Sequence, residues 1–229
     1  MFQVSRDWNP RQARLKEIIL KPERLNEARE LLLQMHRMVH ASGVYNTSTP
    51  TYMDEITLNL SEQAFRTMPT IKDATIAWDI WHITRIEDLT ANILIADSEP
   101  ILNDNWLKML GTKVRDTGNA MTDEEIIAFS RAVRMDALFD YRNAVGHKTR
   151  EILQALSAAD LKRRMRKDQL DRIAAEGGVL NHPQSAWLLD FWGRKTVAGL
   201  CLMPITRHQV VHLSDCAKLK VKCGKRTAT

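Results

Sequence analysis

Apolar residues recur at alternating intervals of three and four over most of this chain, which is the period of an amphipathic helix. The pattern is strongest over residues 72–96, with the sequence KDATIAWDIWHITRIEDLTANILIA. Three further long segments, residues 22–42, 135–156 and 185–220, show the same period. The only alternation typical of a strand, over residues 219–223, is too short to carry weight. The pattern therefore predicts an all-α protein.

Shorter helices are predicted in the connections between the long segments. A first helix is expected over residues 9–20, and residues 157–178 are typical of one polar helix. Thr122 with Glu125 three residues later is a capping box, which marks another helix start. Four long segments joined in this way favour a four-helix bundle in one domain over residues 1–217. The pattern alone leaves its topology open.

The net charge of +5 changes this picture only at the C-terminal end. One stretch without acidic residues contains five cations, which equal the whole surplus: Lys218, Lys220, Lys222, Lys225 and Arg226. We expect residues 218–229 to form a basic, frayed and solvated tail. A phosphate-binding arm for nucleic acid is the weaker alternative.

Composition further favours a soluble, cytoplasmic protein. The N-terminal residues contain charges from Arg6 onward and no secretory apolar region, and the longest apolar run, VAGLCLMPI, is too short to cross a bilayer. The three cysteines, Cys201, Cys216 and Cys223, form no CxxC motif and leave one unpaired in any pairing. This usage fits a reducing compartment better than a disulfide framework.

Two histidine pairs have the i, i+4 spacing that can chelate a metal on a helix: His36 with His40, and His208 with His212. At 100° per residue, His208 and His212 lie inside the apolar face of their helix, and His82 lies at the centre of the apolar stripe of residues 72–96. His36 and His40 lie roughly 70° and 110° from the middle of theirs, where histidine is commonly a surface or boundary residue.

Three imidazoles from two core faces can therefore share one divalent cation. His82, His208 and His212 leave a coordination position open for a water, a thiol or a substrate. Cys216, one turn beyond His212, could close the site as a fourth ligand, although ordinary packing is the simpler interpretation. Gln209 stands where a zincin protease needs the glutamate of H-E-x-x-H, so metalloprotease chemistry is not expected.

The stretches TIAWDIWHITRIEDLTANILI and LLDFWGRKTVAGLCLMPITRHQVVHL resemble the DinB/YfiT-like family of metalloenzymes. The hallmark of that family is one histidine on the second bundle helix and an H-x-x-x-H pair on the fourth, which match His82, His208 and His212. The flanking motifs WHITRIED and TRHQVVHL resemble the DinB-like subgroup, and the similarity extends to HRMVHAS and DTGNAMTDEEI.

The resemblance implies an up-down-down-up bundle with a divalent metal at one end of its core. Zinc or nickel is the expected ion, with iron, manganese or copper as alternatives. It also implies a homodimer and a thiol-dependent transferase or isomerase that uses a low-molecular-weight thiol and a small-molecule electrophile. The competing hypothesis is a non-catalytic stress-response dimer whose metal is structural or absent.

Other residues near His82 have open roles. Arg85 could orient an anionic substrate or form a structural ion pair, and we favour the ion pair. Glu87 and Asp88 lie off the His82 stripe and are expected to support the ligands or to join helices. Trp78 and Trp81 could line a pocket, but packing is the commoner use of tryptophan on a core stripe.

Overall fold

The computed structural model describes residues 1–71 and 73–226, and these residues form helices and loops without a named strand. The prediction of an all-α protein is confirmed. The α-helices are α1 (Asn9–Ile18), α2 (Leu25–Val39), α3 (Tyr52–Thr57), α4 (Glu62–Arg66), α5 (Ile76–Asp88), α6 (Asp104–Leu110), α7 (Asp123–Ala132), α8 (Met135–Ala155), α9 (Ala158–Lys162), α10 (Lys167–Ala175), α11 (Pro183–Gly193), α12 (Val197–Leu202) and α13 (His208–Arg226). Shorter 3₁₀ or π-helical stretches are η1 (Val4–Trp8), η2 (Pro22–Arg24), η3 (Ser42–Tyr45), η4 (Leu89–Ile95) and η5 (Met203–Arg207).

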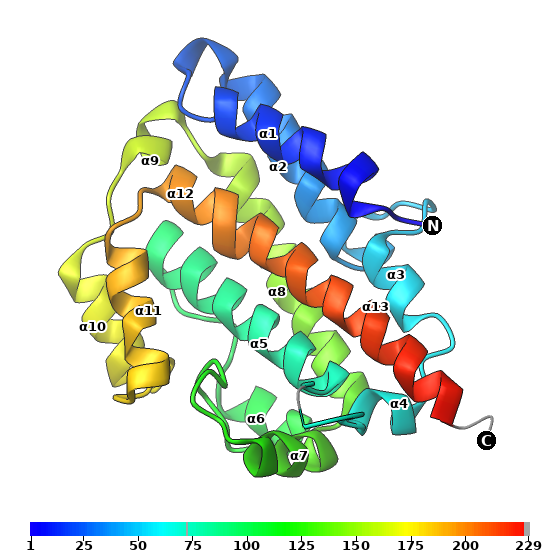
Figure 1. Ribbon diagram of the computed structural model, residues 1–229. Coiled ribbons are helices and arrows are strands. Elements are labelled where there is room, and N and C mark those ends of the chain that lie inside the picture. Colours follow the sequence, from blue (N-terminus) through cyan, green and yellow to red (C-terminus); the bar gives the residue numbers. More distant parts are fainter. Residues whose placement is uncertain (72, 227–229) are drawn as a thin grey trace.

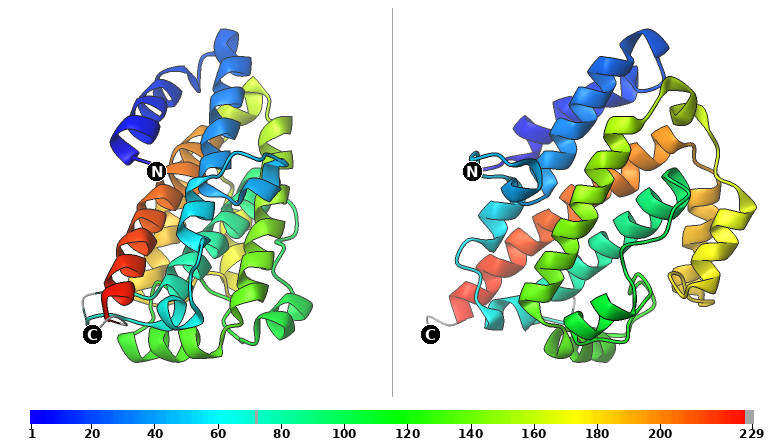
Figure 2. Two further views of the ribbon diagram at one scale, coloured as in Figure 1. Left: turned by 90° about the vertical axis from the view of Figure 1, so that its right-hand side faces the viewer. Right: turned by 180° about the vertical axis from the view of Figure 1, so that it is seen from behind.

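The long helices α2, α5, α8 and α13 lie side by side around a common core. Helix α5 packs against both α8 and α13, and α2 packs against α8 and α13 on the other side. Figures 1 and 2 show α2 and α13 running in one direction and α5 and α8 in the opposite one. Helix α5 is therefore placed between two neighbours and is buried along almost its whole length.

The strongest helix signal, over residues 72–96, begins later in the structure than the pattern suggests. Thr75 is the N-cap of α5, and its hydroxyl accepts a hydrogen bond from the backbone N–H of Trp78. Ile71 precedes the helix and is 85% exposed, and Lys72 lies outside the described residues. Beyond Asp88 the helix continues as the π-helical stretch η4.

The polar segment at residues 157–178 forms two helices, α9 and α10, so the prediction of a single helix was wrong. The intervening residue Arg164 forms an isolated antiparallel bridge with Thr196, just before α12. Backbone pairing with another part of the chain is invisible to a helical pattern, because it depends on which segment lies beside it.

The basic C-terminal stretch begins as the last turns of α13, which extends unbroken to Arg226. Lys218 and Lys222 bond to Asp215 and Asp73 at 2.7 and 2.5 Å. Lys220 donates to backbone carbonyls that follow α3, including that of Ile56 at 2.8 Å. These three cations therefore bond within the chain, whereas residues 227–229 lie outside the described part. A domain boundary after residue 217 stays a prediction.

Candidate metal centre

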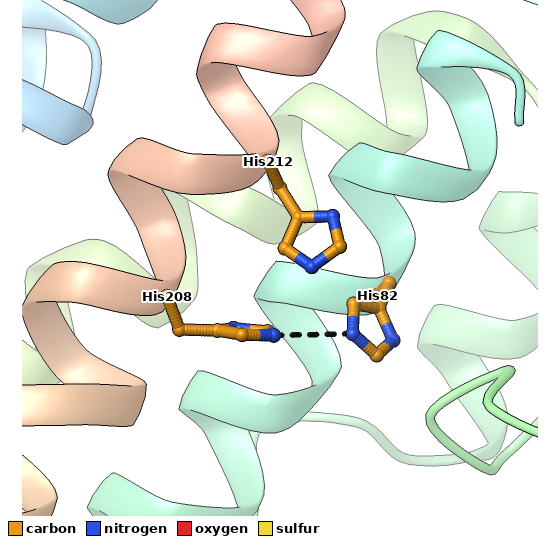
Figure 3. A group of neighbouring side chains, drawn as sticks. All are labelled: His82, His208 and His212. Carbon is orange, nitrogen blue, oxygen red and sulfur yellow. Dashed lines mark hydrogen bonds between the residues drawn. The ribbon is translucent and has the colours of Figure 1, made fainter. Parts of the chain in front are cut away.

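The structure brings the three histidines of the two core helices together. His82 projects from α5, and His208 and His212 project from the first turns of α13, with their rings turned toward one another (Figure 3). The Nε2 atoms of His82 and His208 are 3.2 Å apart, and one ring nitrogen of each histidine lies within 4.8 Å of the others. Nitrogen ligands about 2.0–2.1 Å from a tetrahedral zinc are about 3.3 Å apart. The spacing therefore fits a single small cation.

An irregular stretch of backbone sets the position of His208 and His212. Helix α12 ends in η5, a π-helical stretch that contains Pro204 and leads directly into α13. The side chain of the buried Gln209 donates to the carbonyls of Pro204 at 3.2 Å and of Ile83 on α5 at 3.0 Å. Gln209 also accepts a hydrogen bond from Arg142 on α8 at 3.0 Å. The residue that replaces the zincin glutamate is thus a cross-link between α13, α5 and α8.

A loop before α7 fixes the ring of His82. Three consecutive carbonyls, those of residues 116, 117 and 118, accept hydrogen bonds from ring N–H groups of Trp81, His82 and Trp78 at 3.0, 2.7 and 3.2 Å. The Nδ1–H of His82 therefore points at the loop, and its Nε2 lone pair points at the other histidines. Trp78 stacks on the His82 ring, with centroids 4.7 Å apart and planes 8° from parallel.

A buried carboxylate fixes the ring of His212 in the same way. Asp79 on α5 accepts a hydrogen bond from His212 Nδ1 at 2.7 Å, which leaves Nε2 of His212 free to face the centre. Carboxylate–histidine pairs of this kind orient metal-bound imidazoles and raise their basicity. The sequence analysis missed Asp79, although its position one turn before His82, in WDIWH, was a usable signal.

Burial disfavours the charged form of His82 and of His208. It lowers the pKa of His82 to about 3, and it lowers the pKa of His208 well below its usual value, with mutual repulsion among the three rings as a second cause. Burial also raises the pKa of Asp79, against the hydrogen bond from His212. A neutral imidazole carries the lone pair that a metal ligand needs.

A cavity of about 400 Å³ opens beside the three histidines, and all three line it. Trp78, Ile86 and Asn119 form one part of its wall. Residues of α11 and η5 form the rest, which the helical pattern could not place because α11 is far from α5 in sequence. Any ligand in this cavity lies next to the ring nitrogens of the site.

The roles of the neighbouring candidates are now distinguishable. Arg85 forms a buried ion pair with Asp88 at 2.9 Å, which agrees with the structural interpretation. Trp78 lines the cavity, whereas Trp81 packs in the core against Phe129 and Tyr141. Cys216 is buried, and the group of histidine ligands within 4.8 Å of one another does not include its sulfur.

The prediction that His36 and His40 lie at a surface or boundary was wrong, since both are fully buried. Their Nε2 atoms lie 2.8 and 3.0 Å from the two carboxylate oxygens of Glu87 on α5, and Tyr45 bonds to Nδ1 of His36 at 2.7 Å. The helical wheel considered only the apolar stripe of α2. Helix α8 and the turn η3 cover its other side, and Glu87 supplies the polar partner.

This second group, His36, His40 and Glu87, also places potential ligand atoms within 4.8 Å of one another. Both Nε2 atoms and both carboxylate oxygens are already joined by hydrogen bonds, and all three side chains are sealed from solvent. Gly146 of α8 leaves room for the His40 ring, because a Cβ there would lie 2.5 Å from Nδ1. The group therefore joins α2 to α5 through buried hydrogen bonds.

No helix among the described residues has the length and apolar character needed to cross a membrane. A search of curated proteins found no match to the chain. The family model of the DinB superfamily matches residues 46–214, a span that contains His82, His208 and His212 but begins after His36 and His40. This match covers most of the chain, and with the all-α fold and the three histidines it shows that the protein belongs to the DinB superfamily.

Proposed function

We propose that the protein is a metal-dependent enzyme in which His82, His208 and His212 bind one divalent cation. The observation that carries the proposal is the convergence of three imidazoles on a point that also borders a cavity. A fourth ligand from the chain is absent from this group among the described residues, so a water or a substrate can complete the coordination. Zinc or nickel is the proposed ion, and iron, manganese or copper also suit three imidazoles.

The proposed reaction is a thiol-dependent transfer or isomerisation of a small electrophile. A divalent cation held by neutral ligands supplies Lewis acidity and lowers the pKa of a thiol or water that it binds. The protein orients this chemistry: the carbonyl of Thr117 and the carboxylate of Asp79 hold the rings of His82 and His212. The apolar cavity walls would shield part of a bound substrate from water.

Metal analysis of protein purified without a tag tests the proposed site. We expect about one equivalent of a divalent metal in the wild-type protein and a large loss in His208→Ala and His212→Ala. His147→Ala, which removes an exposed histidine on α8, is the matched control and should keep the metal. Equal metal content in all four proteins would reject the site.

Cobalt substitution tests whether the site is open. An exchangeable coordination position should alter the visible spectrum of the cobalt protein when a thiol is added. A spectrum that does not respond would favour the alternative of a non-catalytic protein with a structural metal. The homodimer and the cytoplasmic location that the resemblance and composition imply remain predictions, and sedimentation of the purified protein would test the former.

A further inference from the structure

One wall of the cavity beside the histidines consists of large aromatic and aliphatic side chains. Trp187, Phe191 and Trp192 come from α11, and Met203 and Pro204 come from η5. Trp187 and Phe191 meet edge to face, with ring centroids 5.9 Å apart. Trp187 remains 48% exposed, so part of its ring is open to contact with a ligand. This wall is suited to the flat or branched apolar body of a small molecule.

The polar groups of the cavity are few and uncharged. Among the described residues, the polar side chains of the lining are the three imidazoles, Asn119 and the N–H groups of the tryptophans. The described lining contains no Asp, Glu, Lys or Arg. A bound cation at the histidines would satisfy one anionic donor atom. A second charge farther along the ligand would lose its water and meet no counter-charge, which makes its burial unfavourable.

Three cations close to this region lie outside the cavity lining. Arg85 is paired with Asp88, and Arg142 donates to the carbonyl of Val39 and to Gln209. The ammonium group of Lys195 lies over the ring of Phe191, 4.3 Å from its centroid, but Lys195 does not line the cavity. None of these three side chains lines the cavity.

We infer that the site selects an uncharged, largely apolar molecule, aromatic or branched aliphatic, that directs a single donor atom toward the histidines. This inference rests on the function proposed above and narrows its substrate class. It distinguishes the site from one built for small polyanionic substrates, which would need arginine or lysine in the lining. The cavity volume of about 400 Å³ lies within the range of small-molecule sites, which is about 300–1,000 Å³.

Matched thiols titrated into the cobalt-loaded protein test the inference. Phenylmethanethiol and 4-(mercaptomethyl)benzoate share a donor atom and a ring and differ by one carboxylate, and 2-mercaptoethanol lacks the ring. We expect phenylmethanethiol to bind at least about tenfold more tightly than either of the others, measured by the change in the visible spectrum. Equal or tighter binding of the carboxylate probe would overturn the inference.

Variants of α11 show whether the wall causes the preference. Phe191→Ala should weaken the binding of phenylmethanethiol several-fold and leave that of 2-mercaptoethanol unchanged. Leu189→Ala, on the same helix but outside the lining, is the control and should keep the preference. An unchanged preference in Phe191→Ala would show that the wall does not select the ligand.

The same experiment separates failure of this inference from failure of the proposed function. If the protein binds cobalt and every thiol alters the spectrum equally, the metal site stands and the substrate class is wrong. If cobalt does not bind, or no thiol alters the spectrum, the proposed function fails. In that case, ligand-observed NMR measures the binding of benzyl alcohol and of benzoate to the protein as purified. Equal binding of the two compounds would overturn the apolar preference itself.

Discussion

His212 on α13 donates a hydrogen bond from Nδ1 to the carboxylate of Asp79 on α5, 2.7 Å away. The two residues are 133 positions apart in the chain. The contact fixes the tautomer of His212, because a ring whose Nδ1 carries the proton presents a bare Nε2 on its other side. Asp79 is 2% exposed, whereas the His212 ring is partly exposed. The pair thus links helix packing to the direction of a ligand lone pair.

Replacement of Asp79 by asparagine should weaken metal binding without removing a ligand. The amide cannot supply the negative charge that raises the basicity of the imidazole, and loss of such a partner typically costs about 10–100-fold in metal affinity. Competition with a chromogenic chelator measures the affinity. Asp140→Asn, an exposed carboxylate on α8, is the control. An affinity equal to that of the wild-type protein in Asp79→Asn would show that the pair has no part in ion binding.

Gly118 should tolerate no side chain. It adopts a φ of +77°, and a Cβ there would lie 2.7 Å from Nε1 of Trp78, the ring that stacks on His82. We expect Gly118→Ala to lower the free energy of unfolding by about 1–3 kcal/mol and to weaken metal binding, because the loop that orients His82 must shift. Gly43→Ala is the matched control, since nothing lies within 4 Å of its Cβ and its φ is not positive. Equal urea midpoints for the two variants would contradict the expectation.

The sequence predicted the all-α class and the three histidines that the structure brings together, but not their surroundings. Helical period follows from local geometry, and the wheel placed His82, His208 and His212 on buried faces without knowledge of the neighbours. The aromatic wall of α11 and the carbonyls of residues 116–118 depend on which loop lies beside α5. These contacts follow from tertiary packing, which the hydrophobic period of the sequence does not reveal.

The error over His36 and His40 has a related cause. A wheel measures the angle from one apolar stripe and assumes that the opposite side faces water, which fails when a helix has neighbours on two sides. The sequence predicts that Glu87 supports the metal ligands or joins helices. Its bonds to both histidines join α2 to α5. Buried polar pairs of this kind cannot be recognised from either helix alone, because each half appears as a surface residue.

Replacement of Glu87 by glutamine should destabilise the protein and leave its metal content unchanged. The amide removes the negative charge and replaces one of the two accepting oxygens with an NH₂ donor, which cannot pair with an imidazole N–H; an unpaired buried polar group costs about 1–3 kcal/mol. Urea unfolding measures the loss, and Glu151→Gln, on the exposed side of α8, is the control. Metal analysis of the same samples separates the two histidine groups. Loss of an equivalent of metal in Glu87→Gln would show that the second group, and not hydrogen bonding alone, holds an ion.

The metal-free protein should begin to lose stability at pH values well above those at which carboxylates usually titrate. Burial lowers the pKa of both His40 and His82 to about 3, from an ordinary value of 6.5. Between these values the unfolded chain binds protons that the folded chain excludes, so the free energy of unfolding falls as the pH decreases from 6.5 toward 3. Each such histidine contributes about 1–2 kcal/mol of loss between pH 6.5 and pH 5.

Two carboxylates modify this acid dependence in opposite directions. The two imidazoles around Glu87 hold its pKa well below its usual value, which adds to the loss of stability at lower pH, whereas burial raises the pKa of Asp79, which opposes it. Urea unfolding in the presence of a chelator, at intervals from pH 7.5 to pH 4.5, measures the sum and excludes metal release as a cause. The free energy of unfolding should decline from about pH 6.5. A value that stays level down to pH 5 would mean that these buried histidines accept protons in the folded protein, and that their lone pairs are not held ready for a cation.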